Sequence, residues 1–193
     1  MKKGILMIAA CCLGGCNDDP PAPGGNKYDE LNAMLRADYS KILITVTDDF
    51  GEDALTSTYE LNYSESSVTV RYSVERFAEI GGLLDDVTDA KTTLVGEAVI
   101  KDGQVISNDG EVALDASIAD LGLCFKEEYF ENVQLTGVYL KADVKEASKF
   151  LGVETVCTDV EIEATFLEVF YDISVRYTSE RGGKVSYRYE FTL

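Results

Sequence analysis

The sequence predicts a mainly β domain that has one N-terminal helix and a curved antiparallel sheet. Apolar and polar residues alternate through most of the chain after residue 40, and this alternation is the period of a β-strand. Each alternating run has one apolar and one polar face, as expected for an antiparallel sheet with water on one side. The expected hairpin registers also place all of the apolar faces on the same side of the sheet.

The first sixteen residues have the pattern of an export signal. Lys2 and Lys3 form a basic head, and the apolar run that follows is about half of the ~20 residues that a membrane-spanning helix needs. The run ends in Leu13-Gly14-Gly15-Cys16, which resembles the lipobox of bacterial lipoproteins. The resemblance implies that residues 1–15 are a signal peptide. It also implies that Cys16 becomes the mature N-terminus and holds the protein in the bacterial envelope through its lipid.

Residues 16–27 are expected to form a flexible tether between the lipid and the domain. This stretch holds all three prolines of the chain and no large apolar residue. A single domain is expected over residues 28–193. It begins with a predicted helix over residues 28–39, because apolar residues recur there every three or four positions, at Tyr28, Leu31, Leu35 and Tyr39.

The period-two pattern predicts six strands, at residues 42–47, 55–63, 68–75, 156–166, 169–177 and 185–193. An even loop across residues 48–53 is expected to place Val46 opposite Leu55, and the four-residue loop 64–67 to place Tyr59 opposite Tyr72. The last two strands share parity, so we expect an odd loop of at least three residues, with a glycine in the left-handed conformation. This register puts Tyr177, Tyr187 and Tyr189 on one side of the sheet.

The middle of the chain is less regular. Residues 94–101 and 104–107 are expected to form a short hairpin around the turn Asp102-Gly103. Residues 133–144 predict one strand with a bulge at Gly137, where the apolar parity shifts. Residues 145–151 predict a helical turn that Gly152 closes, whereas residues 114–130 have no clean period.

The composition argues against nucleic-acid binding and against an enzyme. The formal net charge of -18 repels phosphate backbones. The sequence contains no His, so it has no Ser-His or Cys-His pair for nucleophilic catalysis. It also lacks a Gly-x-Ser-x-Gly motif and a Gly-rich phosphate loop. We therefore predict a protein without a catalytic centre and without a cofactor.

Acidic clusters are the remaining candidates for chemistry. Glu127, Glu128 and Glu131 are residues of the type that serves as acid and base in sugar hydrolysis. The loop Asp48–Asp53 and the loop with Asp85, Asp86 and Asp89 carry the oxygen ligands that calcium uses. With 35 acidic residues, however, such clusters arise by chance, and neither loop follows the EF-hand spacing. The sequence therefore favours solvated surface and ordinary turns, with no metal site.

Two residue types leave an alternative open. Cys124 and Cys157 lie beyond the leader and the lipid site, and an exported protein permits either a disulfide between them or two thiols. Tyrosines gather on the predicted inner faces of the strands, and a tyrosine hydroxyl requires water or a partner. Such a face is either the margin of the core or the lining of a ligand site, whose candidate residues are Tyr59, Tyr72, Tyr177 and Tyr189.

The order of a tether, one helix and long antiparallel strands with short helical elements resembles the half-barrel of lipoprotein carriers and related envelope lipoproteins. The resemblance covers residues 28–193 and implies a curved sheet wrapped on short helices, with an apolar cup. The tyrosine-rich inner faces depart from a purely aliphatic cup, and a closed barrel or a sandwich is the alternative fold.

Two functions follow from this interpretation of the sequence. The first is a membrane-anchored, non-enzymatic lipoprotein that binds an apolar or amphipathic small molecule or lipid in its concave face. The second is a surface-exposed interaction or adhesion module with a filled core, whose protein partner is unknown.

Overall fold

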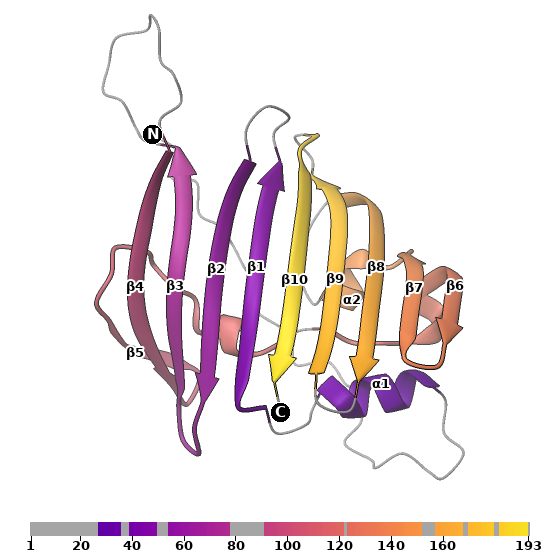
Figure 1. Cartoon of the computed structure of the whole chain (residues 1–193), viewed down its shortest axis with the longest axis horizontal. Helices are drawn as coiled ribbons and strands as arrows, with labels where there is room; N and C mark the ends of the chain where they lie inside the picture. Colours follow the sequence, from indigo (N-terminus) through magenta and orange to yellow (C-terminus); the bar gives the residue numbers. More distant parts are fainter. Residues whose placement is uncertain are drawn as a thin grey trace, which may run out of the picture.

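The computed structural model describes residues 27–35, 39–49, 54–77, 91–121, 123–151, 157–167, 170–179 and 182–192. Within these residues, ten antiparallel strands form one sheet (Figure 1). The strands are β1 (Lys41–Asp49), β2 (Ala54–Tyr63), β3 (Val68–Phe77), β4 (Lys91–Lys101), β5 (Gln104–Asn108), β6 (Phe130–Thr136), β7 (Tyr139–Val144), β8 (Cys157–Leu167), β9 (Phe170–Ser179) and β10 (Lys184–Thr192). Their order is β5-β4-β3-β2-β1-β10-β9-β8-β7-β6, with β5 and β6 at the two edges. The prediction of a mainly β fold with an open antiparallel sheet is confirmed, and the described strands form neither a closed barrel nor a sandwich.

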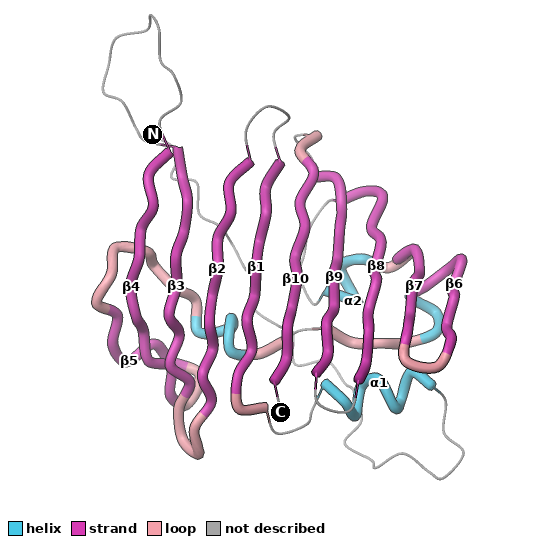
Figure 2. Tube along the Cα trace, viewed as in Figure 1, coloured by secondary structure: helices cyan, strands magenta, loops and turns pink. Residues whose placement is uncertain are grey.

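The first and last strands meet at the centre of the sheet. β1 pairs with β10 from Lys41 opposite Thr192 to Asp49 opposite Lys184. The connection from β5 to β6 leads from one edge of the sheet to the other, and it carries the short 3-10 helices η1 (Ala116–Ala119) and η2 (Glu127–Tyr129). Figure 2 shows this connection passing behind the strands, on the side where α2 (Ala147–Leu151) also lies.

The core lies between the sheet and these short elements. Ile42, Ile44 and Val46 alternate with more exposed residues along β1, and their side of the sheet is called the inner face below. The crossing connection adds buried side chains to the same core, among them Ile118 and Phe125. Alternation thus gives the sheet a dry inner face and a wetted outer face, as the sequence predicted.

The N-terminal helix α1 (Lys27–Leu35) is shorter than predicted. Tyr39, the expected last helical residue, lies outside the helix. Its ring packs on Phe191 at 4.9 Å between centroids, and its hydroxyl donates to the Met34 carbonyl oxygen. Asn32 joins α1 to the crossing connection, because its side chain donates to the Phe125 carbonyl oxygen at 2.6 Å and accepts from the Phe125 N–H at 2.8 Å. The predicted end of the helix at residue 39 is therefore wrong. The Tyr39 ring packs against the sheet, and this tertiary contact outweighs the local preference for a helix.

Among the described helices, none combines the length and the apolar character needed to cross a bilayer.

The registers of the first two hairpins test the parity argument. Tyr59 lies opposite Tyr72 and Tyr63 opposite Val68, which confirms the four-residue loop. The prediction that Val46 lies opposite Leu55 is wrong by two residues, because Val46 pairs with Ser57 instead. The reason is that β1 continues to Asp49 and β2 begins at Ala54, so the strands are longer than the pattern indicated. The loop is still even, and both inner faces coincide.

Two other hairpins follow the predicted turn chemistry. In the β4–β5 turn, Asp102 and Gly103 have φ angles of 51° and 69°, so both central residues are left-handed, as a two-residue turn requires. In the β9–β10 hairpin, Gly182 has a φ of 80°, and the Ser179 N–H donates to the Gly183 carbonyl oxygen at 2.9 Å. The predicted odd loop with a left-handed glycine is confirmed.

The prediction of one bulged strand over residues 133–144 is wrong. The chain forms a hairpin there, in which Gly137, with a φ of 56°, turns β6 back into β7 and Thr136 pairs with Tyr139. A bulge does occur, but at Asn132 in β6, whose φ is 51°. A parity shift at a glycine fits both a bulge and a turn, and the structure selects the turn. The helical turn predicted for residues 145–151 is α2, and Gly152 lies outside the described residues.

Candidate functional site

The structure divides the predicted ligand-lining tyrosines into two groups. Tyr59 and Tyr72 are 1% and 4% exposed, so they belong to the core and leave almost no surface for a ligand. The Tyr72 hydroxyl donates a hydrogen bond of 2.8 Å to Asn108 Oδ1, which gives its polar end a partner inside the protein. Tyr177 and Tyr189 are only half-buried, and they remain candidates for ligand contact.

Tyr177, Tyr187 and Tyr189 lie together on the inner face, and we call them the tyrosine cluster. Their ring centroids are 6.1 Å apart between Tyr177 and Tyr187 and 6.3 Å apart between Tyr187 and Tyr189, with interplanar angles of 16° in both pairs. This confirms that the three side chains share one side of the sheet. The stack continues to the fully buried Phe191 at 6.5 Å, so the cluster is anchored in the core. Rings and hydroxyls together make an amphipathic surface.

Asp48 brings a charge to this face. It follows Ile44 and Val46 in the inward alternation of β1, and it lies in register with Leu55 on one side and Val185 on the other. Burial raises the pKa of its carboxyl group. Within the described residues, it has no ion pair with Lys or Arg. A half-buried carboxylate therefore lies among apolar and aromatic neighbours, and the described part of the chain gives it no basic partner.

The Asp48 carboxylate is close enough to the tyrosines to affect their hydroxyls. Burial is the main cause that raises the pKa of Tyr187, and the neighbouring hydroxyls and the charge of Asp48 add to it. Burial also raises the pKa of Tyr177, where a hydrogen bond with Tyr187 acts in the opposite direction and Asp48 adds to the increase. These phenols consequently stay neutral at physiological pH, and Asp48 gives the face a negative charge.

Replacing Asp48 by Asn is expected to raise the free energy of unfolding at neutral pH. The gain is at most about 1 kcal/mol, since a half-exposed carboxylate is only partly desolvated. Folding raises the pKa of Asp48 above its usual value of 3.8. At pH values between the unfolded and the folded pKa, the native protein therefore binds more protons at this carboxyl than the unfolded chain does. Stability conferred by this group therefore falls as the pH rises through that range.

Urea titrations of the wild type and of Asp48→Asn at about pH 3 and about pH 7 measure this difference, because the other carboxylates cancel in the comparison. Asp49→Asn is the control, since Asp49 is exposed and alternation places it on the outer face. A stability difference between wild type and Asp48→Asn that is the same at both pH values would contradict the expectation.

A hollow of about 490 Å³ lies near the ends of β1, β8, β9 and β10, and residues of both faces of the sheet line it. Its charged lining residues are Asp49, Asp159, Glu161, Arg176 and Lys184. A bulge at Asp159, whose φ is 53°, interrupts the pairing of β8 with β9 at this place. The hollow combines both signs of charge, so its lining singles out no class of ligand. Tyr177 of the tyrosine cluster and Val185 also line it, so the hollow reaches one end of that cluster.

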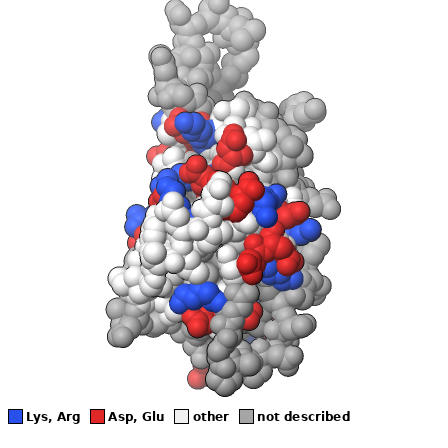
Figure 3. Space-filling model, turned by 90° about the vertical axis from the view of Figure 1, so that its right-hand side faces the viewer, with Lys and Arg blue, Asp and Glu red and all other residues white. Residues whose placement is uncertain are grey.

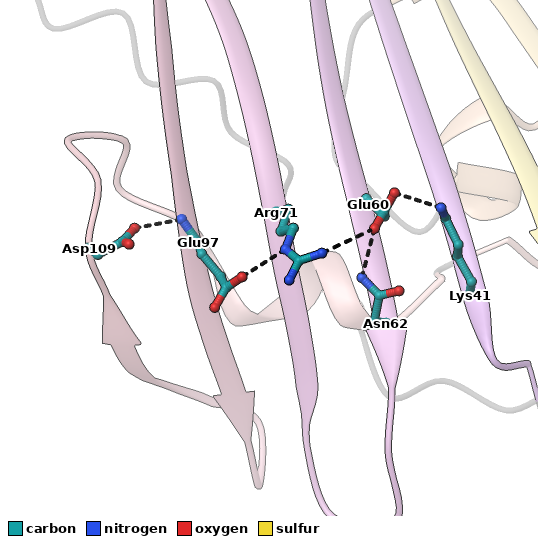
Figure 4. A network of polar contacts seen from close by, with 6 residues as sticks. All are labelled: Lys41, Glu60, Asn62, Arg71, Glu97 and Asp109. Carbon is teal, nitrogen blue, oxygen red and sulfur yellow. Dashed lines mark hydrogen bonds and ion pairs between the residues drawn. The ribbon is translucent and has the colours of Figure 1, made fainter.

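Several charges elsewhere on the outer face form cross-strand ion pairs. Arg71 Nε donates to Glu97 Oε2 at 2.8 Å, and Arg71 Nη1 lies 4.0 Å from Glu60 Oε1. Glu60 Oε2 in turn accepts from Lys41 Nζ at 2.6 Å (Figure 4). Hydrogen bonds from Lys41 and Asn62 lower the pKa of the Glu60 carboxyl. On the β6–β7 side of the molecule, acidic and basic groups are likewise interspersed (Figure 3). The outer face therefore resembles a solvated surface with cross-strand ion pairs.

The acidic clusters do not form a site in the described part of the chain. Glu127, Glu128 and Glu131 are all exposed. No group of three or more Asp, Glu or Cys side chains is placed to hold a metal ion within the described segments. Asp48 and Asp49 belong to β1, whereas residues 50–53 and 85–89 lie outside the described residues.

Cys124 and Cys157 are half-buried thiols, so of the two alternatives left open by the sequence the structure has the unbridged one. Cys124 lies in the crossing connection, where its N–H donates to the Phe150 carbonyl oxygen at 3.1 Å. Cys157 begins β8 opposite Ser179, and it adds to the rise in the pKa of Tyr177. The two thiols thus belong to different layers of the fold.

Sequence reasoning missed the position of Asp48 beside the tyrosine cluster. It assigned Asp48 to an acidic loop, although the even parity shared with Ile44 and Val46 was a signal for an inward-facing position.

Comparisons with protein-family models, with curated proteins and with solved structures found no match.

Proposed function

We propose that this chain is a non-enzymatic, lipid-anchored protein of the bacterial envelope that binds an amphipathic small molecule or lipid on the inner face of its sheet. The tyrosine cluster beside Asp48 is the observation that carries the ligand-binding part. It is a half-buried surface of stacked rings, continuous with the core, at which hydroxyl groups and one carboxylate lie next to apolar area. Pockets for small ligands combine apolar lining with a few polar groups in this way.

The anchoring part of the proposal rests on the leader sequence. The basic head, the short apolar run and the Leu13–Cys16 sequence are together the elements that a lipoprotein signal needs. Through Cys16 and its lipid, the protein would be held at the membrane, and the tether to residue 27 would separate the domain from the surface.

Mass spectrometry of the mature N-terminus, after expression of the full chain in bacteria, tests the anchor. We expect cleavage before Cys16 and a lipid adduct on that residue, and we expect Cys16→Ser to abolish both. Cys12→Ser is the matched control and should be processed normally. An unmodified terminus, or a Cys16→Ser variant that remains in the membrane fraction, would overturn the anchor.

Binding of octanol, a neutral amphiphile, tests the inner face. Tyr177→Ala removes a half-buried ring from the cluster and is expected to weaken binding of octanol in calorimetric titrations. Tyr139→Ala is the control, because Tyr139 is equally half-buried but alternates with the inward Leu140 and Ala142 of β7. If the wild type does not bind octanol, or if both variants lose binding alike, the ligand proposal fails.

An interaction module is the second candidate. It is favoured by exposed apolar residues near one edge of the sheet, where Val95 in β4 is 68% exposed and Ile106 in β5 is 60% exposed. Edge strands offer unpaired backbone groups to a second chain. This candidate predicts that Ile106→Lys abolishes a protein complex without changing octanol binding, whereas Tyr177→Ala has the opposite pattern.

A further inference from the structure

The surroundings of Asp48 indicate which amphipathic ligand the inner face would select, an inference that rests on the proposed function. The neighbours of Asp48 across the strands are Leu55 on β2 and Val185 on β10, both apolar. Tyr59, Tyr177 and Tyr187 are near enough for its charge to act on their hydroxyls. These five neighbours of the carboxylate are therefore all neutral.

An ionised carboxylate in such a setting is short of favourable contacts. Elsewhere on the sheet, the carboxylates of Glu60, Glu163 and Asp172 accept from Lys or Arg at 2.6–2.7 Å. Asp48 differs from them in lacking a basic partner within the described residues, although it is more buried than an ordinary surface carboxylate. A cation from outside the chain can supply the missing charge and displace water from a low-dielectric position, where the attraction is stronger than at the surface.

We propose that the inner face binds a cationic amphiphile, whose protonated amine lies at the Asp48 carboxylate and whose apolar body lies on the rings of Tyr177 and Tyr187. The amine donates hydrogen bonds to the carboxylate and to tyrosine hydroxyl oxygens, which accept them. The apolar body covers ring surface that the stacked arrangement leaves half-exposed. The net charge of -18 also draws cations toward the protein and repels fatty acids and anionic lipids.

Calorimetric titrations with octylammonium, octanoate and octanol separate the contribution of charge from that of the apolar body, since the three probes share one alkyl chain. We expect the full-length wild type to bind octylammonium about tenfold more tightly than octanol, and octanoate most weakly. Asp48→Asn should remove the preference for octylammonium over octanol. Asp49→Asn removes the same charge from the next residue, on the outer face, and should retain the preference.

The outcomes distinguish this inference from the proposed function. If octanol binds and depends on Tyr177 but Asp48→Asn keeps the preference for octylammonium, the cation inference is wrong and the amphiphile proposal stands. Equal losses in Asp48→Asn and Asp49→Asn would assign the preference to net charge and also overturn the inference. If none of the three probes binds to a wild type that circular dichroism shows to be folded, both fail. Thermal unfolding of each variant checks that the Asn variants are folded.

Discussion

Replacing Phe191 by Ala is expected to lower the free energy of unfolding by about 3–5 kcal/mol. Phe191 is 0% exposed and lies on β10 in the middle of the sheet, next to β1 and β9. Its ring contacts Tyr39 at 4.9 Å, Tyr171 at 6.5 Å and Tyr189 at 6.5 Å between centroids. Truncation therefore leaves a cavity where β10 pairs with β1. The three aromatic rings around this cavity lose their contacts with Phe191, and no neighbouring side chain replaces them.

Urea unfolding followed by circular dichroism measures this loss, with the midpoint and the slope fitted together. Thr192→Ala provides the matched control, since Thr192 is the next residue of β10 and its side chain is exposed. A loss below about 1 kcal/mol for Phe191→Ala, or an equal loss for Thr192→Ala, would show that the inward parity of β10 is wrong.

The same parity explains how much of the fold the sequence predicts. Alternation of apolar and polar residues is a local signal, and it identified the inner residues of β1, β2, β3, β8, β9 and β10. Register between neighbouring strands follows when the loop is short, as for Tyr59 opposite Tyr72. The pairing of β1 with β10 joins the two ends of the domain, and no local pattern contains that information.

The errors have physical reasons as well. Val46 pairs with Ser57, because strand ends depend on tertiary hydrogen bonds rather than on propensity. The glycine at residue 137 was compatible with a bulge and with a turn, and only packing distinguishes them. For the candidate site, the sequence predicted that the tyrosines of β9 and β10 lie on one side of the sheet. It did not predict that Tyr59 and Tyr72 are buried or that Asp48 lies beside the tyrosine cluster, because both depend on how far the core fills the inner face.

Gly96→Ala is the second substitution with a large expected effect, a loss of about 1–3 kcal/mol from overpacking. Gly96 lies opposite Tyr72, and a Cβ at residue 96 would meet the Tyr72 hydroxyl and lie 2.6 Å from its Cζ and 2.9 Å from the Cα of Gly110. A Cβ at Gly110 would meet the same hydroxyl and lie 3.0 Å from the Cα of Gly96. The two glycines therefore leave the room in which Tyr72 reaches Asn108 at 2.8 Å. Alanine is no worse than glycine in a strand, so the loss reports the clash rather than propensity.

A double-mutant cycle with Tyr72→Phe assigns this loss to its cause. Tyr72→Phe alone should cost about 1 kcal/mol, because Asn108 loses a hydrogen-bond donor. In the double variant the closest of the clashes with the new Cβ, that with the hydroxyl, is gone, whereas those with Cζ and with Gly110 Cα remain. The combined loss should therefore be smaller than the two single losses together. Thr93→Val, at an exposed position of β4, should change stability by less than about 0.5 kcal/mol. Strictly additive losses would mean that Gly96 and Gly110 do not confine the Tyr72 hydroxyl. The Tyr72 ring would then be free to move toward the inner surface, and Tyr72 would again be a candidate for contact with a ligand.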